Sequence, residues 1–281
     1  MKLGIVVGSR GAPPSAYVTL REDFARAVEI AAGIGFHGIE LALRSADEVD
    51  LPALQSALSA HGLAVPCIST GQVFATDGLS FTNPDPAVRE QATGRILAMI
   101  ELAGELGAGV NTGRVRGSVP AGQTLDMARQ QSLVCLHRCA DAAAKRGVRL
   151  LIEPINRYES NFINTCQEAL DLIHQAGRDC VFVMPDLFHM NIEEASFGDA
   201  LRGAGSRVGY VHVADSNRWA PGWGHLPFDE ILGLLDEIGY DDFLTAEILP
   251  QPDALRAAAQ TFAYLAPRLE RRRAAGRGCP L

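Results

Sequence analysis

The chain has 281 residues, of which 47% are hydrophobic and 21% charged, and its formal charge at pH 7 is -8. This composition is ordinary for a globular protein, and the length suits one large α/β domain or two smaller ones. The acidic balance argues against the attraction to phosphate on which sequence-independent nucleic-acid binding depends, so we predict no nucleic-acid partner.

The sequence carries no recognisable targeting or membrane signal. The first residues, MKLGIVVGSR, lack the long apolar core and the cleavage site of a secretory signal, and no stretch approaches the roughly 20 apolar residues of a membrane span. The six cysteines form no CxxC pair, which argues against a zinc knuckle or a disulfide framework. We therefore predict a protein of the reducing cytoplasm without membrane contact.

Strand-like apolar runs alternate along the chain with segments whose apolar residues recur at helical spacing. Strands are predicted at residues 3–7, 38–43, 63–68, 108–112, 148–153, 180–186, 208–215 and 242–247. Helices are predicted at residues 21–34, 52–61, 86–106, 123–146, 166–176, 192–203, 228–238 and 252–270. Glycines such as Gly35, Gly62 and Gly107 follow predicted helix ends, where a left-handed cap residue is least strained.

This alternation predicts an α/β fold, a (β/α)8 TIM barrel. Repeated βα units account for nearly the whole chain, so we expect one barrel domain over residues 1–270 and a basic, frayed tail over 271–281. An open, doubly wound sheet would show much the same local pattern.

Four of the predicted strands end with a residue that binds hard metal ions: Glu153, Asp186, His212 and Glu247. Their separations of 33, 26 and 35 residues each allow one strand and one helix, so a barrel would bring all four side chains to one rim. In an open sheet these strands would run towards one edge and could not surround one ion. The set therefore favours the closed barrel.

A divalent cation is the condition for such a cluster. Carboxylates brought together without a cation would repel one another and take up protons. Three carboxylates and one imidazole make a mostly hard site, which fits Mn²⁺ best, with Mg²⁺ or Co²⁺ as alternatives.

Longer motifs around these residues resemble a known family. EPINRYE at 153–159, DLFH at 186–189 and HVADSNRWAPGWGH at 212–225, with the late Glu247, resemble the xylose isomerase-like (sugar phosphate isomerase/epimerase) superfamily, in its tagatose/psicose 3-epimerase branch. The resemblance covers nearly the whole chain. In addition, residues 69–85 and GRVRG at 113–117 are similar to the group that epimerises 5-keto-L-gluconate to D-tagaturonate.

The resemblance implies that Glu153, Asp186, His212 and Glu247 hold the metal and that the two glutamates transfer protons. A 2-keto sugar bound through its carbonyl and C3 oxygens would lose its C3 proton to one glutamate, pass through a cis-enediolate, and gain a proton from the other on the opposite face. We expect such an epimerase to use no nucleotide cofactor. Relatives commonly self-associate, which implies a homodimer or homotetramer.

The resemblance also assigns residues that contact the substrate. Glu159 and Arg218 match positions near the reacting end of the sugar, although a salt bridge that orients Glu153 is an alternative for them. His189 follows Asp186 by three residues and would face the same mouth of the barrel.

Two further substrate contacts are expected on loops. Arg116, or its neighbour Arg114, follows the fourth strand and could bind a carboxylate or phosphate through a forked pair of hydrogen bonds. The sequence contains no Gly-rich phosphate loop, which favours a free keto-sugar acid over a sugar phosphate, with a neutral ketose as the alternative. Gln72 lies in the irregular stretch 70–86, where a barrel would place a substrate loop.

The sequence is also compatible with other functions of the same fold. Aldose–ketose isomerases of the hydroxypyruvate type and inosose dehydratases use the same barrel and ligand set. A DNA-repair (AP) endonuclease of this superfamily uses three zinc ions and many histidines, whereas only His189, His212 and His225 are expected near this mouth. A sugar-binding protein without catalysis would have no use for two opposed bases.

Overall fold

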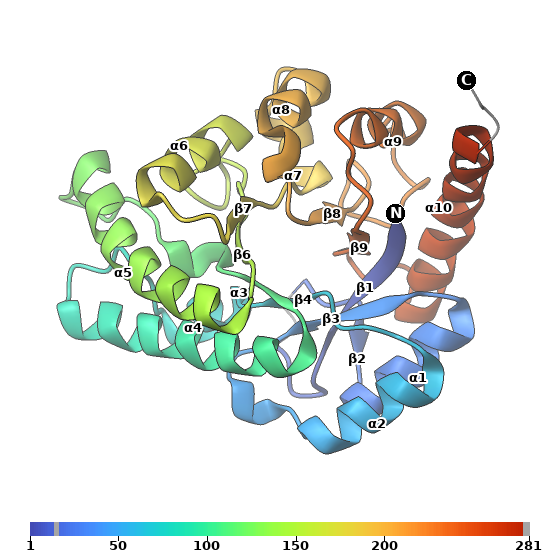
Figure 1. Cartoon of the computed structure of the whole chain (residues 1–281), viewed down its shortest axis with the longest axis horizontal. Helices are drawn as coiled ribbons and strands as arrows, with labels where there is room; N and C mark the ends of the chain where they lie inside the picture. The colour runs from blue at the N-terminus through green and yellow to red at the C-terminus, as the bar shows by residue number, and fades with distance from the viewer. Residues whose placement is uncertain (14–16, 278–281) are drawn as a thin grey trace.

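The computed structural model describes residues 1–13 and 17–277, with side chains as far as residue 274. Eight parallel strands curl into a barrel (Figure 1). They are β1 (Lys2–Gly8), β3 (Gly38–Ala42), β4 (Cys67–Ser69), β5 (Gly109–Asn111), β6 (Leu150–Ile152), β7 (Val181–Val183), β8 (Val211–Val213) and β9 (Phe243–Ala246). A short strand, β2 (Leu20–Arg21), pairs with β1 beside the barrel.

The strand order is β7-β6-β5-β4-β3-β1-β9-β8, and every neighbouring pair is parallel. Single bridges between Val183 and Val208 and between Asp186 and His212 join the two ends of this order. The sheet is therefore closed, which confirms the predicted barrel and excludes the open, doubly wound alternative.

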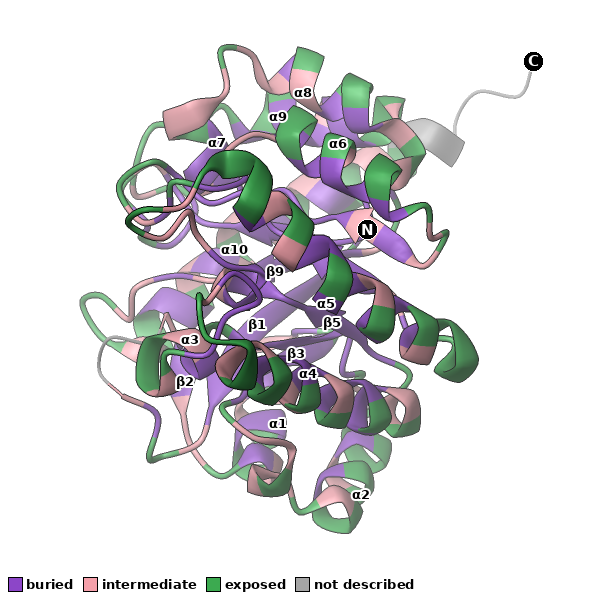
Figure 2. Ribbon diagram, turned by 90° about the vertical axis from the view of Figure 1, so that its left-hand side faces the viewer, coloured by how far each residue is buried: buried purple, intermediate pink, exposed green. Residues whose placement is uncertain are grey.

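Helices surround the strands in Figure 1, and their outward faces are the exposed parts of the molecule in Figure 2. They are α1 (Phe24–Ile34), α2 (Leu51–His61), α3 (Gly71–Asp77), α4 (Pro86–Leu106), α5 (Leu125–Arg146), α6 (Cys166–Ala176), α7 (Leu187–Glu193), α8 (Phe197–Ala204), α9 (Phe228–Glu237) and α10 (Ala254–Arg277). Three single turns lie between them, η1 (Ala46–Glu48), η2 (Gly113–Arg116) and η3 (Gly205–Arg207). No helix in the described part of the chain is long and apolar enough to cross a membrane.

The helix ends follow the predicted cap chemistry. Gly107 after α4 and Gly147 after α5 both have φ of 67°, and the backbone N–H of each donates to a carbonyl in the last turn of its helix. A side chain would be strained in that conformation, so glycine ends each helix and turns the chain back towards the barrel.

Three expectations about elements differ from the structure. The irregular stretch 70–86 contains a helix, α3. The helix expected at 192–203 begins later, at Phe197 in α8, because Ser196 caps it, and a separate helix, α7, ends at Glu193. Helix α10 continues to Arg277, into the tail expected at 271–281, and residues 278–281 of that tail lie outside the described residues.

Alternation along the strands separates two sets of side chains. Val211 and Val213 of β8 pack in the main core between strands and helices. Tyr210, one position earlier, belongs to a separate cluster with Leu151 and Phe243 from β6 and β9. Since successive strand residues point to opposite faces, His212 must share the inner face with Tyr210.

Candidate metal centre and active site

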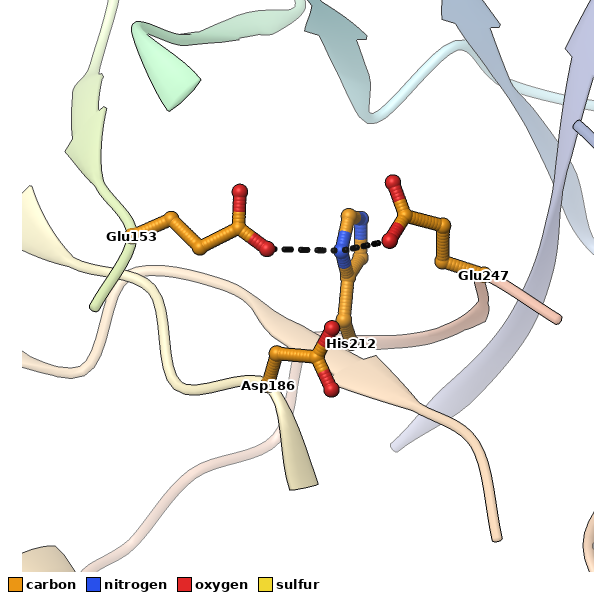
Figure 3. A group of neighbouring side chains, drawn as sticks. All are labelled: Glu153, Asp186, His212 and Glu247. Carbon is orange, nitrogen blue, oxygen red and sulfur yellow. Dashed lines mark ion pairs between the residues drawn. The ribbon is translucent and has the colours of Figure 1, made fainter. Parts of the chain in front are cut away.

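Four side chains meet at one rim of the barrel. Glu153 follows β6, Asp186 follows β7, His212 lies in β8 and Glu247 follows β9. Each offers one ligand atom, and these atoms all lie within 4.8 Å of one another (Figure 3). The structure thus brings together the four residues that the sequence predicts.

Because strand residues alternate between the two faces of the sheet, these side chains point into the barrel. Leu151 of β6 lies in the inner cluster, so Glu153, two residues later, points the same way. Along β9, Phe243 of the inner cluster, Thr245 and Glu247 are likewise two residues apart, so Glu247 also points inward. Glu153 and Asp186 follow β6 and β7, whereas His212 lies in β8 and Glu247 follows β9, so the cluster forms where the bridges between β7 and β8 close the barrel.

In three of the four residues, Glu153, Asp186 and His212, one polar atom has a fixed partner and another faces the neighbouring ligands. One Glu153 oxygen, Oε2, accepts a hydrogen bond of 2.7 Å from Asn111 Nδ2. Asp186 Oδ1 caps α7 by accepting from the Phe188 N–H at 2.8 Å, while Oδ2 is buried without a hydrogen-bond partner. His212 Nδ1 is likewise buried and unpartnered. Buried atoms of this kind are costly unless something binds them, and a divalent cation fits both.

The contacts around His212 show how crowded the charges are. Its Nδ1 lies 3.5 Å from Glu153 Oε1 and 3.8 Å from Glu247 Oε2, the two ion pairs drawn in Figure 3. Burial acts to lower the pKa of His212, but Glu40 and Glu247 outweigh it and raise the pKa well above its ordinary value. The surrounding carboxylates therefore favour the protonated form of the His212 imidazole.

The two glutamates respond in opposite directions. Burial acts to raise the pKa of Glu153, but the close approach and charge of His212 outweigh it and lower the pKa to about 2. At Glu247 burial dominates over Arg218 and His212 and raises the pKa to about 8. The two pKa values move apart because carboxylates this close cannot all be ionised without a cation.

Arg218 lies directly beside this cluster. It belongs to the loop after β8 and has a left-handed backbone, with φ of 60°. Its guanidinium pairs with Glu247 and lies 3.7 Å from Asp186 Oδ2 and 3.9 Å from Glu159 Oε1. The ring of Tyr17 covers it at 3.8 Å. The buried carboxylates outweigh burial and raise the pKa of Arg218, so this arginine stays charged.

A buried carboxylate fixes the loop that carries Arg218. Asp215 accepts hydrogen bonds from the backbone N–H groups of Ser216, Gly222 and Leu226 at 2.7 to 3.0 Å. The Arg218 N–H donates to the Asp215 carbonyl at 2.8 Å. This network holds the left-handed conformation that directs Arg218 into the barrel mouth.

A cavity opens above the cluster and is lined by Glu153 and Glu247. The wall also contains Tyr17, Gln72, Asn111, Arg114, Glu159, His189 and Arg218. An opposed pair of carboxylates, one arginine and one histidine around a single cavity can bind a small polar molecule and move its protons.

A family model for xylose isomerase-like TIM barrels matches residues 28–265. The chain belongs to this family. It is 35% identical over 219 residues to an L-ribulose 3-epimerase of Mesorhizobium japonicum, a match that covers 76% of this chain and 71% of that protein. It is 32% identical over 232 residues to a D-psicose 3-epimerase of Ruminiclostridium cellulolyticum, covering 80% of this chain and 78% of that protein.

Solved structures agree with these relatives. The structure of an L-ribulose 3-epimerase superposes with a TM-score of 0.81 at 28% identity and covers 99% of this chain and 98% of that one. The resemblance of the sequence to the xylose isomerase-like superfamily and its ketose 3-epimerase branch is therefore confirmed.

Within the xylose isomerase-like barrel, four of the five expected substrate contacts line the cavity: Gln72, Glu159, His189 and Arg218. The side chain of Gln72 also donates to the Ala42 carbonyl at 2.8 Å, which ties it to β3. Glu159 lies near Arg218 rather than beside Glu153, so Asn111 and not a salt bridge orients Glu153.

His189 presents one ring nitrogen to the cavity side. Asn156 Nδ2 donates to His189 Nδ1 at 2.7 Å, which leaves Nε2 facing Asp186 at 3.8 Å and Arg218 at 3.4 Å. Burial lowers the pKa of His189 despite the nearby Asp186. A neutral His189 with its proton on Nε2 can donate a hydrogen bond to a bound ligand.

The fifth expected contact, Arg116, is corrected by the structure. Its guanidinium is buried and donates to the carbonyls of Gly113, Phe162 and Ile163 at 2.8 to 2.9 Å, and burial lowers its pKa to about 10. It therefore ties η2 to the loop after β6, away from the cavity. Arg114 lines the cavity instead and stacks on Phe74 at 4.4 Å.

Three residues of the site were not singled out from the sequence. Asn111 is a polar residue at the end of an apolar strand, and Glu40 is a carboxylate inside the apolar run GIELAL. Both are signals of a buried polar role, because such groups are costly inside a strand unless paired. Tyr17 lies in the loop after β1, where the sequence offers no comparable signal.

We predict that metal binding releases protons. The raised pKa of Glu247, about 8, and the raised pKa of His212 favour protonated forms of both ligands at neutral pH, and a cation must displace these protons to reach both ligand atoms. Affinity for Mn²⁺ should therefore rise as the pH rises through the pKa of Glu247, about 8. The measurement is calorimetric titration in buffers with different ionisation enthalpies.

The E247Q variant is the matched control for this titration, and it should release fewer protons than the wild type. A binding heat that is the same in every buffer at pH 7 would contradict the prediction.

Proposed function

We propose that this protein is a divalent-metal-dependent epimerase that inverts C3 of a 2-keto sugar or keto-sugar acid. One observation carries the proposal: Glu153 and Glu247 reach towards His212 from opposite sides of the cluster in Figure 3 and line the same cavity. Similarity to L-ribulose and D-psicose 3-epimerases supports this choice of chemistry.

Glu153, Asp186, His212 and Glu247 would hold the cation. The hard donor set favours Mn²⁺, with Mg²⁺ or Co²⁺ as alternatives. A cation held there would polarise the substrate carbonyl and acidify the neighbouring C–H bond. The buried Oδ2 of Asp186 and Nδ1 of His212, both without a hydrogen-bond partner among the described residues, support this assignment.

The two glutamates would then divide the proton transfer. One removes the C3 proton from its face of the sugar, and the other supplies a proton to the opposite face, so the centre is inverted without a redox cofactor. In the reverse reaction their roles exchange. Placing both carboxylates at one cavity makes such a two-base reaction possible.

Arg218, His189 and Glu159 would bind the reacting end of the sugar. Arg218 is held between the rings of Tyr17 and Phe188, at 3.8 and 4.8 Å, so it can hydrogen-bond a substrate oxygen with little loss of side-chain freedom. His189 would donate from Nε2. Gln72 would complete the wall from α3.

We further propose that the substrate carries a carboxylate. Arg114 supports this, because its guanidinium reaches the cavity and forms no ion pair with any described residue. A free guanidinium in a cavity otherwise rich in carboxylates would hold an anionic group by forked hydrogen bonds. The pair 5-keto-L-gluconate and D-tagaturonate is our first candidate.

Neighbouring reactions share the same ligand set. An aldose–ketose isomerase of the hydroxypyruvate type and an inosose dehydratase would begin with the same proton abstraction and differ in the later steps. A DNA-repair endonuclease is disfavoured: among the described residues, the one side-chain group able to hold a metal contains a single histidine, whereas that enzyme needs three zinc ions.

The setting of the enzyme is also part of the proposal. We propose a cytoplasmic enzyme that acts on a small keto sugar or sugar acid. We also propose that it assembles as a homodimer or homotetramer.

We predict that E153Q and E247Q each lower turnover by about 10²- to 10⁴-fold, the usual contribution of a positioned general acid or base. The assay follows the Mn²⁺-loaded enzyme in D₂O by NMR with 5-keto-L-gluconate, D-tagaturonate, D-tagatose, D-psicose and hydroxypyruvate. Deuterium should enter at the inverted C3 of a ketose. Deuterium at C1, or loss of water, would instead indicate an isomerase or a dehydratase.

The control for these variants is E237Q, on the outer face of α9, where Glu237 forms an ion pair with Arg202. It should keep wild-type turnover. Near-normal turnover by either E153Q or E247Q would contradict the two-base mechanism.

We predict that R114Q raises the KM for keto-sugar acids by about ten-fold or more, since a hydrogen bond to a charged group contributes about 1.5–3 kcal/mol. The KM for neutral ketoses should stay nearly constant. The matched control is R157Q. Arg114 and Arg157 both line a second cavity, but Arg157 is neutralised by Glu193 at 2.8 Å. An equal rise in KM for acids and neutral ketoses would argue against a carboxylate contact.

A further inference from the structure

Glu40 is a buried carboxylate that neither belongs to the metal cluster nor lines the cavity. It lies in the middle of β3 and is fully buried. Its neighbours in the strand, Ile39 and Leu41, pack in the main core on the other face, so the Glu40 side chain points into the barrel. A carboxylate in such a place is unfavourable unless a partner compensates it.

The partner is His212. Glu40 Oε2 lies 2.9 Å from His212 Nε2, and both side chains have no exposure to solvent. The other Glu40 oxygen, Oε1, has no hydrogen-bond partner. Tyr210 and Thr245, which lie in the same layer, hydrogen-bond each other instead. Within the described part of the chain, the Glu40 carboxylate is therefore hydrogen-bonded to His212 alone.

This contact distinguishes the two nitrogens of the His212 ring. Nε2 faces Glu40, while Nδ1 faces Glu153 at 3.5 Å and Glu247 at 3.8 Å and has no hydrogen-bond partner. A neutral imidazole carries one N–H, and the partner of one nitrogen determines which nitrogen keeps the lone pair. A carboxylate at Nε2 holds the N–H there and leaves the lone pair of Nδ1 directed at the three acidic ligands.

We infer that Glu40 is a positioning residue for the metal centre. It accepts a hydrogen bond from His212 Nε2–H, fixes the orientation of the ring and reserves Nδ1 as the ligand atom. The inference rests on the proposed metal site and adds to it a residue on the opposite side of the barrel from Asp186. Carboxylates that hold a ligating histidine in this manner also make the imidazole a stronger donor to the metal.

The first test measures metal affinity rather than turnover. The dissociation constants of Mn²⁺ and Co²⁺ are measured by calorimetry for the wild type, E40Q and E40L, with folding checked by circular dichroism. E40L removes the acceptor and should weaken binding by about 10- to 100-fold, the usual effect of losing such a partner. E40Q keeps an oxygen acceptor but loses the charge, so its dissociation constant should lie between those of E40L and the wild type.

The matched control is Y210F, in the same buried layer, which removes a hydroxyl that bonds Thr245 and not His212. It should change thermal stability without changing metal affinity. If E40Q and E40L also bind both ions with wild-type affinity, Glu40 serves packing alone and the inference is overturned. If the wild type itself binds neither ion, the proposed function fails and this inference fails with it.

A second readout uses only the wild type and so does not depend on variants that fold. In ¹⁵N NMR spectra of the Zn²⁺-loaded protein, His212 should carry its proton on Nε2 and bind the metal through Nδ1. A metal-bound Nε2, or a proton on Nδ1, would overturn the inference.

Discussion

Repulsion among buried carboxylates is the interaction around which this site is organised. Glu153, Asp186 and Glu247 converge on one imidazole at the barrel mouth, with ligand atoms no more than 4.8 Å apart. Charges this close cannot remain ionised in a dry environment without a counter-charge. The surroundings raise the pKa of His212 and of Glu247 and so favour their protonated forms, and the guanidinium of Arg218 pairs with Glu247; a cation bound at the cluster would relieve the same repulsion.

The barrel makes this concentration of charge possible. Parallel strands present their carboxyl ends at one rim, and the period of two along each strand decides which side chains turn inward. Fixed partners then limit how the ligands move: Asn111 holds Glu153, the cap of α7 holds Asp186, and Glu40 holds His212. These contacts come from β5, from the start of α7 and from β3, so ligand geometry depends on the closed barrel as a whole.

Much of the fold and the ligand set could be predicted from sequence, because both depend on local signals. Apolar runs with period two locate the strands, glycines mark the helix ends, and a polar residue at the end of an apolar strand is a strong sign of function. An apolar run marks buried residues, and burial continues beyond the last hydrogen bond between neighbouring strands. Most predicted strands are therefore longer than the observed ones. Hydrophobic spacing does not reveal the break between α7 and α8, because it depends on the side-chain cap that Ser196 forms at the start of α8.

Contacts between distant loops were the part that sequence could not supply. Arg114 and Arg116 are two residues apart and have the same chemistry. Within the single turn of η2, however, Arg114 faces the cavity, whereas Arg116 faces backbone carbonyls near residue 162. Likewise, the stacking of Tyr17 on Arg218 joins the loops after β1 and β8, which only the closure of the barrel brings together.

A crystal structure of the protein grown with Mn²⁺, with an anomalous difference map, tests the central claim most directly. The account predicts one manganese peak at the barrel mouth, bound by Glu153, Asp186, Glu247 and Nδ1 of His212. A map without a peak there, or with manganese bound elsewhere and these four side chains unengaged, would contradict it.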